Sequence, residues 1–301
     1  MKLRVATRGS ALARWQAEHV VALLGKANPD LDVEVVLIET SGDIRRDVPI
    51  YELGGKGVFV KEVQAAVLDG RADVAVHSAK DLPSTTPDGL VIGAVPERAD
   101  VRDALVGSTL DGLEAGAVVA TGSLRRRAQL AHVRPDLVFE GVRGNMGTRV
   151  ERAGRDGVSA VVVAAAALDR LGWADRIAER LDPDVMLPQV GQAALAVECR
   201  VDDDEVRCAL ERIEHTPSRR AVDAERGFLA ELGGDCSLPA AAFATQAGDG
   251  LRIRGLVASE DGKVVVRHET SGPATAGPAL GRSVARHLLD EQGGAALLGR
   301  S

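Results

Sequence analysis

Short β-branched runs alternate with amphipathic stretches over the first hundred residues, and this alternation constrains the fold more than any other feature of the sequence. It is typical of an α/β layer with largely parallel strands. Strands are expected at residues 3–7, 33–39, 73–77 and 90–95. A helix capped by Ser10 is expected to end at Gly25, and residues 58–68 form a second helix.

The same pattern returns in the middle of the chain and then changes. Strands are expected at 118–121, 137–140, 158–165 and 195–198, with helices at 123–131 and 147–153. A helical stretch, 205–232, is broken at Thr216-Pro217. From Pro239 onward strands follow one another at 240–245, 251–258 and 263–269, before a helix near 281–290. That order predicts a separate α+β module.

Composition excludes several classes of protein. A net charge of −7 and an aromatic content of 2% argue against nucleic acid as a partner. The first residues lack the apolar region of a signal peptide, and the longest near-apolar run, 158–168, is shorter than the ~18–20 residues that span a bilayer. Three cysteines without CxxC spacing suggest neither disulfides nor a zinc site. We expect a cytoplasmic protein without a metal or a membrane partner.

The segment His77-Ser78-Ala79-Lys80-Asp81 follows a buried strand, at the edge of an α/β sheet where ligands bind. Pro83 and Pro87 stiffen the loop and so fix the Asp81 carboxylate for acid/base or cation-stabilising chemistry. A surface Lys–Asp ion pair and a packed core histidine remain the structural alternatives for these residues.

Three strand-to-helix joints carry arginine. Each joint combines guanidinium groups with free backbone N–H groups at a helix start. The three joints are Thr7-Arg8-Gly9-Ser10, Gly122-Ser123-Leu124-Arg125-Arg126, and Arg143-Gly144-Asn145 with Arg149 after it. Each joint alone is equally consistent with a solvated basic helix start. Together they predict a ligand with several carboxylates or phosphates, and no nucleotide P-loop is present.

The cysteines differ in their setting. Cys199 and Cys208 fall in a strand and a helix, and we expect them to be buried or inert. Cys236 lies in the glycine-bearing loop Gly233-Gly234-Asp235-Cys236, where a nucleophile or an attachment point is possible.

These motifs, in this order, resemble those of the hydroxymethylbilane synthase (porphobilinogen deaminase) family over nearly the whole chain. The motifs that carry the resemblance are Thr7-Arg8-Gly9-Ser10, Gly54-Gly55-Lys56-Gly57-Val58-Phe59, His77-Ser78-Ala79-Lys80-Asp81, Ser123-Leu124-Arg125-Arg126, Arg143-Gly144-Asn145, Val190-Gly191-Gln192 and Gly234-Asp235-Cys236. The chain departs from the family at Asp235 and Ala193, where glycine is usual.

The resemblance implies a heme-pathway transferase that joins four porphobilinogen molecules head to tail with loss of ammonia, then releases the linear tetrapyrrole by hydrolysis. Its cofactor is a dipyrromethane held covalently by Cys236, and Asp81 is the catalytic residue. Further cofactor contacts fall on Asp81, Lys80, Ser123, Arg125, Arg126, Arg143 and Gly144. Substrate contacts fall on Arg8, Ser10, Lys56, Phe59, Arg149, Arg170 and Gln192.

The implied fold is α/β, with two lobes like those of a periplasmic binding protein and a smaller C-terminal α+β domain. We expect an active-site domain at 1–98 with 193–215, an anion-binding domain at 99–192, and a domain at 216–301 that carries the cofactor cysteine. A monomer is expected. The alternative is a two-lobed carboxylate-binding module without catalysis.

Overall fold

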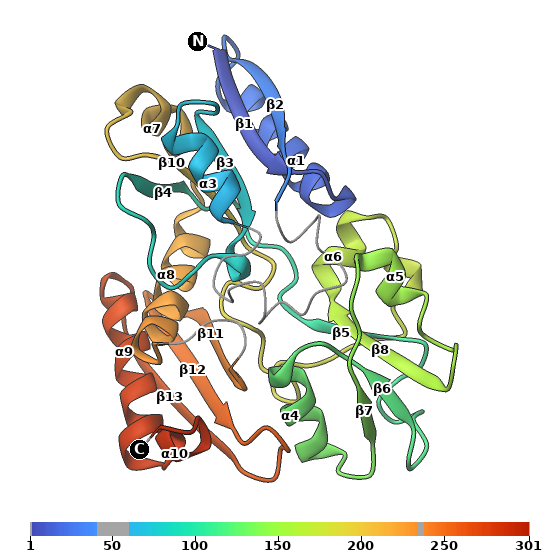
Figure 1. Cartoon of the computed structure of the whole chain (residues 1–301). Coiled ribbons are helices and arrows are strands. Elements are labelled where there is room, and N and C mark those ends of the chain that lie inside the picture. Colours follow the sequence, from blue (N-terminus) through green and yellow to red (C-terminus); the bar gives the residue numbers. More distant parts are fainter. Residues whose placement is uncertain (1, 41–59, 234–237, 301) are drawn as a thin grey trace. The chain divides into compact units, whose positions relative to one another are not determined.

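The computed structural model describes residues 2–40, 60–233 and 238–300. Two compact units make up the chain: residues 1–99 with 193–219, and residues 100–192 with 220–301. Figure 1 labels the main helices and strands of each unit.

Unit 1 is built on a five-stranded mixed sheet with the order β2-β1-β3-β10-β4. Its strands are β1 (Lys2–Arg8), β2 (Asp32–Ile38), β3 (Val74–Ser78), β4 (Leu90–Ala94) and β10 (Leu195–Arg200). β1 runs parallel to β2 and β3, whereas β10 runs antiparallel to both of its neighbours. The carboxyl ends of β1 and β3 consequently lie at the same edge of the sheet.

Helices cover both faces of this sheet. On one face, α1 (Ala11–Ala27) and α7 (Asp204–Glu211) pack their apolar residues on Leu3, Val5 and Val76. On the other, α3 (Lys61–Leu68) packs on Ala6 and Ala75. A short 3-10 turn, η1 (Ala79–Asp81), continues directly from β3.

Unit 2 contains a second five-stranded mixed sheet, ordered β7-β6-β8-β5-β9. Its strands are β5 (Asp103–Val106), β6 (Val118–Ala120), β7 (Val138–Glu140), β8 (Val158–Ala164) and β9 (Glu179–Arg180). β6 is parallel to β7 and β8, and β5 is antiparallel to β8 and β9. One face packs against α4 (Leu124–Val133), and the other packs against α5 (Met146–Val150) and α6 (Ala165–Arg170). A 3-10 turn, η2 (Ala174–Arg176), precedes β9.

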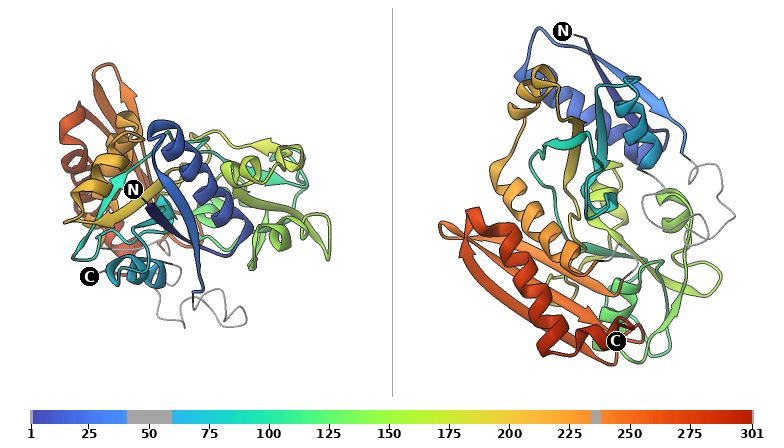
Figure 2. Two further views of the ribbon diagram at one scale, coloured as in Figure 1. Left: turned by 90° about the horizontal axis from the view of Figure 1, so that it is seen from above. Right: turned by 60° about the vertical axis from the view of Figure 1, so that its left-hand side comes forward.

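Unit 2 also holds the third sheet, which is antiparallel: β11 (Ala240–Ala247), β12 (Gly250–Ala258) and β13 (Val265–Pro273). α8 (Thr216–Glu231) and α9 (Gly277–Arg286) lie over one face of it (Figures 1 and 2). The two helices approach closely at Gly281, since a Cβ there would lie 1.9 Å from the Ala224 carbonyl oxygen. The remaining short elements are η3 (Ala274–Ala276), the π-helical turn η4 (His287–Glu291) and α10 (Gly294–Leu297).

The sequence predicted most of these elements, and the α/β class with a smaller C-terminal α+β module is confirmed. Helix α1 runs two residues past the expected end at Gly25, and Asn28 caps it. Strands β5 and β9 and helix α6 were missed. Residues 58–59 of the expected second helix lie outside the described residues. No helix in the described ranges has the length and hydropathy needed to cross a membrane.

Candidate active site

In unit 1, four of the predicted site residues lie where two neighbouring strands end. Arg8 closes β1, and Ser10 caps α1 by accepting a hydrogen bond from the Ala13 amide at 3.2 Å. Lys80 and Asp81 lie in η1, just past the end of β3. Because β1 and β3 are adjacent and parallel, the chain brings these residues to one edge of the sheet.

Asp81 is exposed and Lys80 is half-buried. Backbone hydrogen bonds fix the turn that carries them: the Ala79 amide donates to the Ala194 carbonyl at 3.0 Å, and the Leu82 amide donates to the Ala79 carbonyl at 3.3 Å. An exposed carboxylate on a fixed turn is accessible to a ligand, as acid/base chemistry requires.

In unit 2, Ser123 caps α4 and accepts a hydrogen bond from the Arg126 amide at 3.4 Å. The two following arginines are buried, and both bind Asp103 at the start of β5. Arg125 Nη1 lies 2.9 Å from Asp103 Oδ2, and Arg126 Nη2 lies 2.8 Å from Oδ1. Gln192 Nε2 also donates to Asp103 Oδ1, at 3.0 Å.

This cluster holds two guanidinium groups against one carboxylate. Burial raises the pKa of Asp103, but the charges of Arg125 and Arg126, with hydrogen bonds from Arg125 and Gln192, outweigh it and lower that pKa to about 2. Burial also lowers the pKa of the Arg125 guanidinium. Arg125 Nε and Nη2 are buried and have no hydrogen-bond partner among the described residues. The cluster therefore keeps an excess of positive charge and two unused donors.

The third arginine loop follows β7. Asn145 caps α5 by accepting from the Thr148 amide at 3.0 Å, and Arg149 Nε donates to the Gly144 carbonyl at 2.9 Å. Gly144 has a φ of +102°, which other residues rarely adopt. Arg143 and Gly144 are exposed, so this loop presents a guanidinium group to solvent.

Arg170 ends α6 in the same unit. Burial lowers the pKa of its guanidinium to about 10. It still carries its charge at neutral pH.

Within unit 2 the structure brings Arg125, Arg126 and Gln192 together, and it joins Arg149 of α5 to the loop of Arg143 and Gly144. Lys56, Phe59 and Cys236 lie outside the described residues. The assignment of all these residues to cofactor and substrate stays a prediction.

Sequence reasoning missed Asp103, the residue that organises the arginine pair. It also missed Glu198, a fully buried carboxylate on β10 whose partner is His77. The available signal was weak in both cases: an acidic residue inside a run of apolar ones, at Asp103-Ala104-Leu105-Val106 and Ala196-Val197-Glu198-Cys199.

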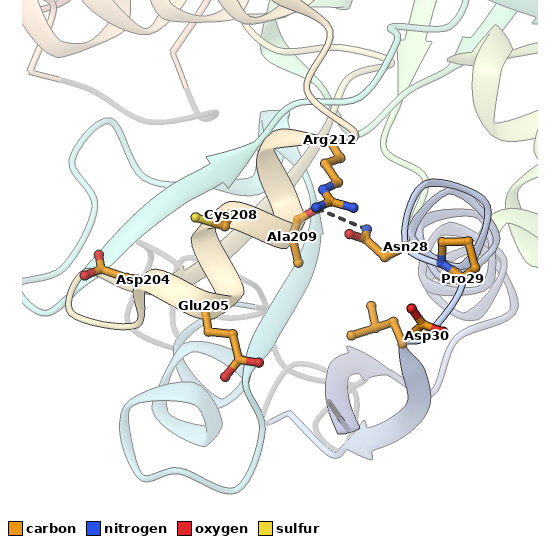
Figure 3. Close-up of a pocket in the computed structure, with 9 residues that line it drawn as sticks. Asn28, Pro29, Asp30, Asp204, Glu205, Cys208, Ala209 and Arg212 are labelled. Carbon is orange, nitrogen blue, oxygen red and sulfur yellow. Dashed lines mark hydrogen bonds between the residues drawn. The ribbon is translucent and has the colours of Figure 1, made fainter.

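The other described cysteines lie away from Asp81. Cys199 is buried in β10, and burial raises the pKa of its thiol to about 11. Cys208 of α7 is exposed, so of the two expectations for it, buried or inert, burial is wrong and inertness stays a prediction. It lines a pocket of about 490 Å³ between α7 and the turn after α1, at the edge of the sheet opposite to Asp81 (Figure 3).

Comparison with known proteins identifies the family. Residues 3–208 match the family described as "Porphobilinogen deaminase, dipyromethane cofactor binding domain", and residues 220–290 match "Porphobilinogen deaminase, C-terminal domain". The chain belongs to the porphobilinogen deaminase family. This result confirms the resemblance drawn from the motifs.

Individual relatives of this chain carry the name of the same family. The porphobilinogen deaminase of Syntrophus aciditrophicus is 46% identical over 97% of this chain and 96% of its own length. That of Chromobacterium violaceum is 47% identical over 96% of this chain and 94% of its own length. Among solved structures, the periplasmic VFT2 domain of Bordetella pertussis BvgS matches 70% of this chain and 86% of that domain, with a TM-score of 0.43 and 17% identity.

Proposed function

We propose that this chain is a transferase that joins four porphobilinogen molecules head to tail on a covalent dipyrromethane primer and then releases the linear tetrapyrrole hydroxymethylbilane by hydrolysis. The observation that carries the proposal is the match of nearly the whole chain to this family, including a domain described by its dipyrromethane cofactor. Apart from Asp235 and Ala193, the motif residues expected of the family are present in this sequence, and Asp81 and Cys236 are among them.

The described residues fit such a cofactor. A dipyrromethane carries acetate and propionate groups, and carboxylates accept paired hydrogen bonds from guanidinium groups. The buried Nε and Nη2 atoms of Arg125 are unused donors in a cluster with excess positive charge. We therefore assign carboxylate binding to Arg125 and Arg126, with help from Ser123, Lys80, Arg143 and Gly144. When bound, the dipyrromethane supplies the pyrrole to which the first substrate is joined.

Asp81 is assigned to the reacting substrate. Loss of ammonia from porphobilinogen leaves an electron-poor azafulvene whose pyrrole nitrogen carries developing positive charge. A fixed carboxylate stabilises that charge and exchanges a proton with the reacting groups. Substrate binding is assigned to a second set of residues, with the arginines placed against the substrate's carboxylates: Arg8, Ser10, Lys56, Phe59, Arg149, Arg170 and Gln192.

We further propose a cytoplasmic monomer without nucleic acid or membrane partners, divided into domains at 1–98 with 193–215, 99–192 and 216–301. The non-catalytic binding module is not favoured, because the C-terminal family match spans Cys236, which such a module would not need.

Intact-protein mass spectrometry tests the proposal. Protein purified from cells that make porphobilinogen is expected to carry two linked pyrroles on Cys236, and Cys236→Ser is expected to carry none. An unmodified wild-type chain would contradict the enzyme assignment. A Cys236→Ser chain that still carries the adduct would show that another residue holds the primer.

A further inference from the structure

Buried polar side chains hold the last two residues of β3 from both faces of the sheet in unit 1. Successive residues of a strand point to opposite faces. His77 accordingly faces the layer of α3, and Ser78 faces the layer of α1. The next residues along the chain form η1, which carries Lys80 and Asp81.

On the α3 face, Glu198 is the central residue. It lies opposite Ala75 in the β3–β10 register and is therefore a diagonal neighbour of His77. His77 Nε2 lies 3.2 Å from Glu198 Oε2, a close polar contact that lacks the alignment of a hydrogen bond. Gln64 of α3 donates through Nε2 to the same oxygen at 2.9 Å. All three side chains are at most 5% exposed.

On the α1 face, Gln16 makes the corresponding contact. Its Nε2 donates to Ser78 Oγ at 2.9 Å, and the Ser78 hydroxyl lies 3.2 Å from Gln16 Oε1, to which it can donate. Gln16 is 4% exposed. It belongs to the helix that Ser10 caps, so this contact joins α1 to the end of β3 through side chains.

Stability alone does not explain these contacts. Burying polar groups costs free energy, and well-packed apolar residues often stabilise a core as well as a buried ion pair does. The Gln64–Glu198 and Gln16–Ser78 hydrogen bonds are directional, however, and they place the Glu198 carboxylate beside His77 and the Gln16 amide beside Ser78, whereas apolar packing permits sliding. Contacts on both faces, with the Ala79–Ala194 backbone hydrogen bond, fix where the strand ends and how the turn leaves it.

We propose that Glu198 and Gln16 are positioning residues that set the location of Lys80 and Asp81 through His77 and Ser78. This inference rests on the proposed function. Only Ala79 and Lys80 separate Ser78 from Asp81, so a shift at the strand end passes directly to the carboxylate. A misplacement of about 1 Å at a reacting group can lower the rate by about 100-fold.

The test compares Glu198→Gln and Gln16→Leu with Asp73→Asn. Asp73 directly precedes β3 at the opposite end of the strand, where it binds Arg4 at 2.7 Å, and it provides a matched polar contact far from the turn. We expect the first two variants to carry the primer and to lose about tenfold or more in kcat, with KM within about twofold of wild type. Asp73→Asn is expected to lower the melting temperature without this change in kcat.

A second pair of variants keeps the test decisive if a core variant fails to fold. Ser78→Ala removes the hydroxyl that Gln16 binds, whereas Ser78→Thr retains it. Threonine is expected to recover most of the kcat that alanine loses. Equal kcat in the two variants overturns the proposal, as does a kcat loss in Asp73→Asn matching that of Glu198→Gln.

Two further measurements, the activity of the wild-type protein and the primer content of the variants, distinguish a failure of this inference from a failure of the proposed function. Wild-type protein that fails to consume porphobilinogen refutes the proposed function, whatever the variants do. Variants that lack the primer, in a background where wild type is loaded and active, refute positioning, because their defect would then lie in cofactor attachment.

Discussion

At the scale of single residues, Asp103 and Asp81 show two uses of a carboxylate. Asp103 is fully buried and forms ion pairs with two arginines, whereas Asp81 is exposed at the end of a fixed turn. The first carboxylate holds binding groups in place. The second remains accessible to a substrate.

Asp81→Asn is expected to fold and to carry the primer but to lose about 100-fold or more in turnover. The amide keeps the shape of the side chain but loses the charge and the proton exchange. Steady-state consumption of porphobilinogen measures the loss, and intact mass checks the primer. Near-normal turnover would remove Asp81 from the mechanism.

Asp103→Asn is expected to destabilise the protein by about 3–5 kcal/mol, because it leaves two buried guanidinium groups without their carboxylate. The pKa of Asp103 is about 2 in the folded protein, below its value in an unfolded chain. Its stabilisation is therefore complete above about pH 4 and is lost as the pH falls toward 2.

Acid unfolding followed by circular dichroism checks the second part of this prediction. Wild type is expected to lose about 2 kcal/mol more than Asp103→Asn between pH 4 and pH 2. Parallel stability curves for the two proteins would show that the arginines do not hold this carboxylate ionised.

At the scale of elements, the turn between β12 and β13 packs against α4, the helix that carries Arg125 and Arg126. Gly262 has a φ of +73°, and a Cβ there would lie 2.3 Å from the Ala128 carbonyl oxygen. His132 Nδ1 lies 3.1 Å from the Gly262 carbonyl oxygen, which can only accept, so the nitrogen donates. This turn thus ties the third sheet to the arginine helix.

Gly262→Ala is expected to lower the free energy of unfolding by about 2–4 kcal/mol, through backbone strain and the clash with α4. Gly248→Ala is the matched control. Gly248 also has a positive φ, +56°, in a turn of the same sheet, but a Cβ there meets nothing within 4 Å. Denaturant unfolding measures both variants, and equal losses would refute the contribution of the α4 contact.

Sequence patterns predicted long periodic elements better than short buried ones. Ser10 and the spacing of the apolar residues after it predicted helix α1, and the structure confirms the cap and the helix. Strand β5 is four buried residues long and β9 only two, so neither offers a period to detect. The pairing of β5 with β8, and of β9 with β5, depends on contacts that a local pattern does not contain.

At the scale of the whole molecule, the order of motifs along the chain was the strongest sequence signal. It predicted the family, because seven short motifs in one order are far more specific than any one of them. The partners of the arginines were not predictable in this way. Asp103 is 22 and 23 positions before Arg125 and Arg126, and only the fold brings them together.

Ala193 stands where the family usually has glycine, and its backbone conformation makes that exchange costly. Its φ is +68°, a region that favours glycine, and alanine there costs about 1–2 kcal/mol. The strain falls where the chain returns from unit 2 to unit 1. Sequence alone reveals the exchange but not the backbone conformation that makes it costly.

The antiparallel strand β10 has a consequence for synthesis on the ribosome. It lies between β3 and β4, yet residues 195–200 are translated about a hundred residues after β4. Until then β3 has an unpaired edge, and β4 lacks the strand that joins it to the sheet. A nascent chain must therefore keep its first lobe incomplete, with His77 lacking the Glu198 carboxylate, while the whole of residues 100–192 emerges.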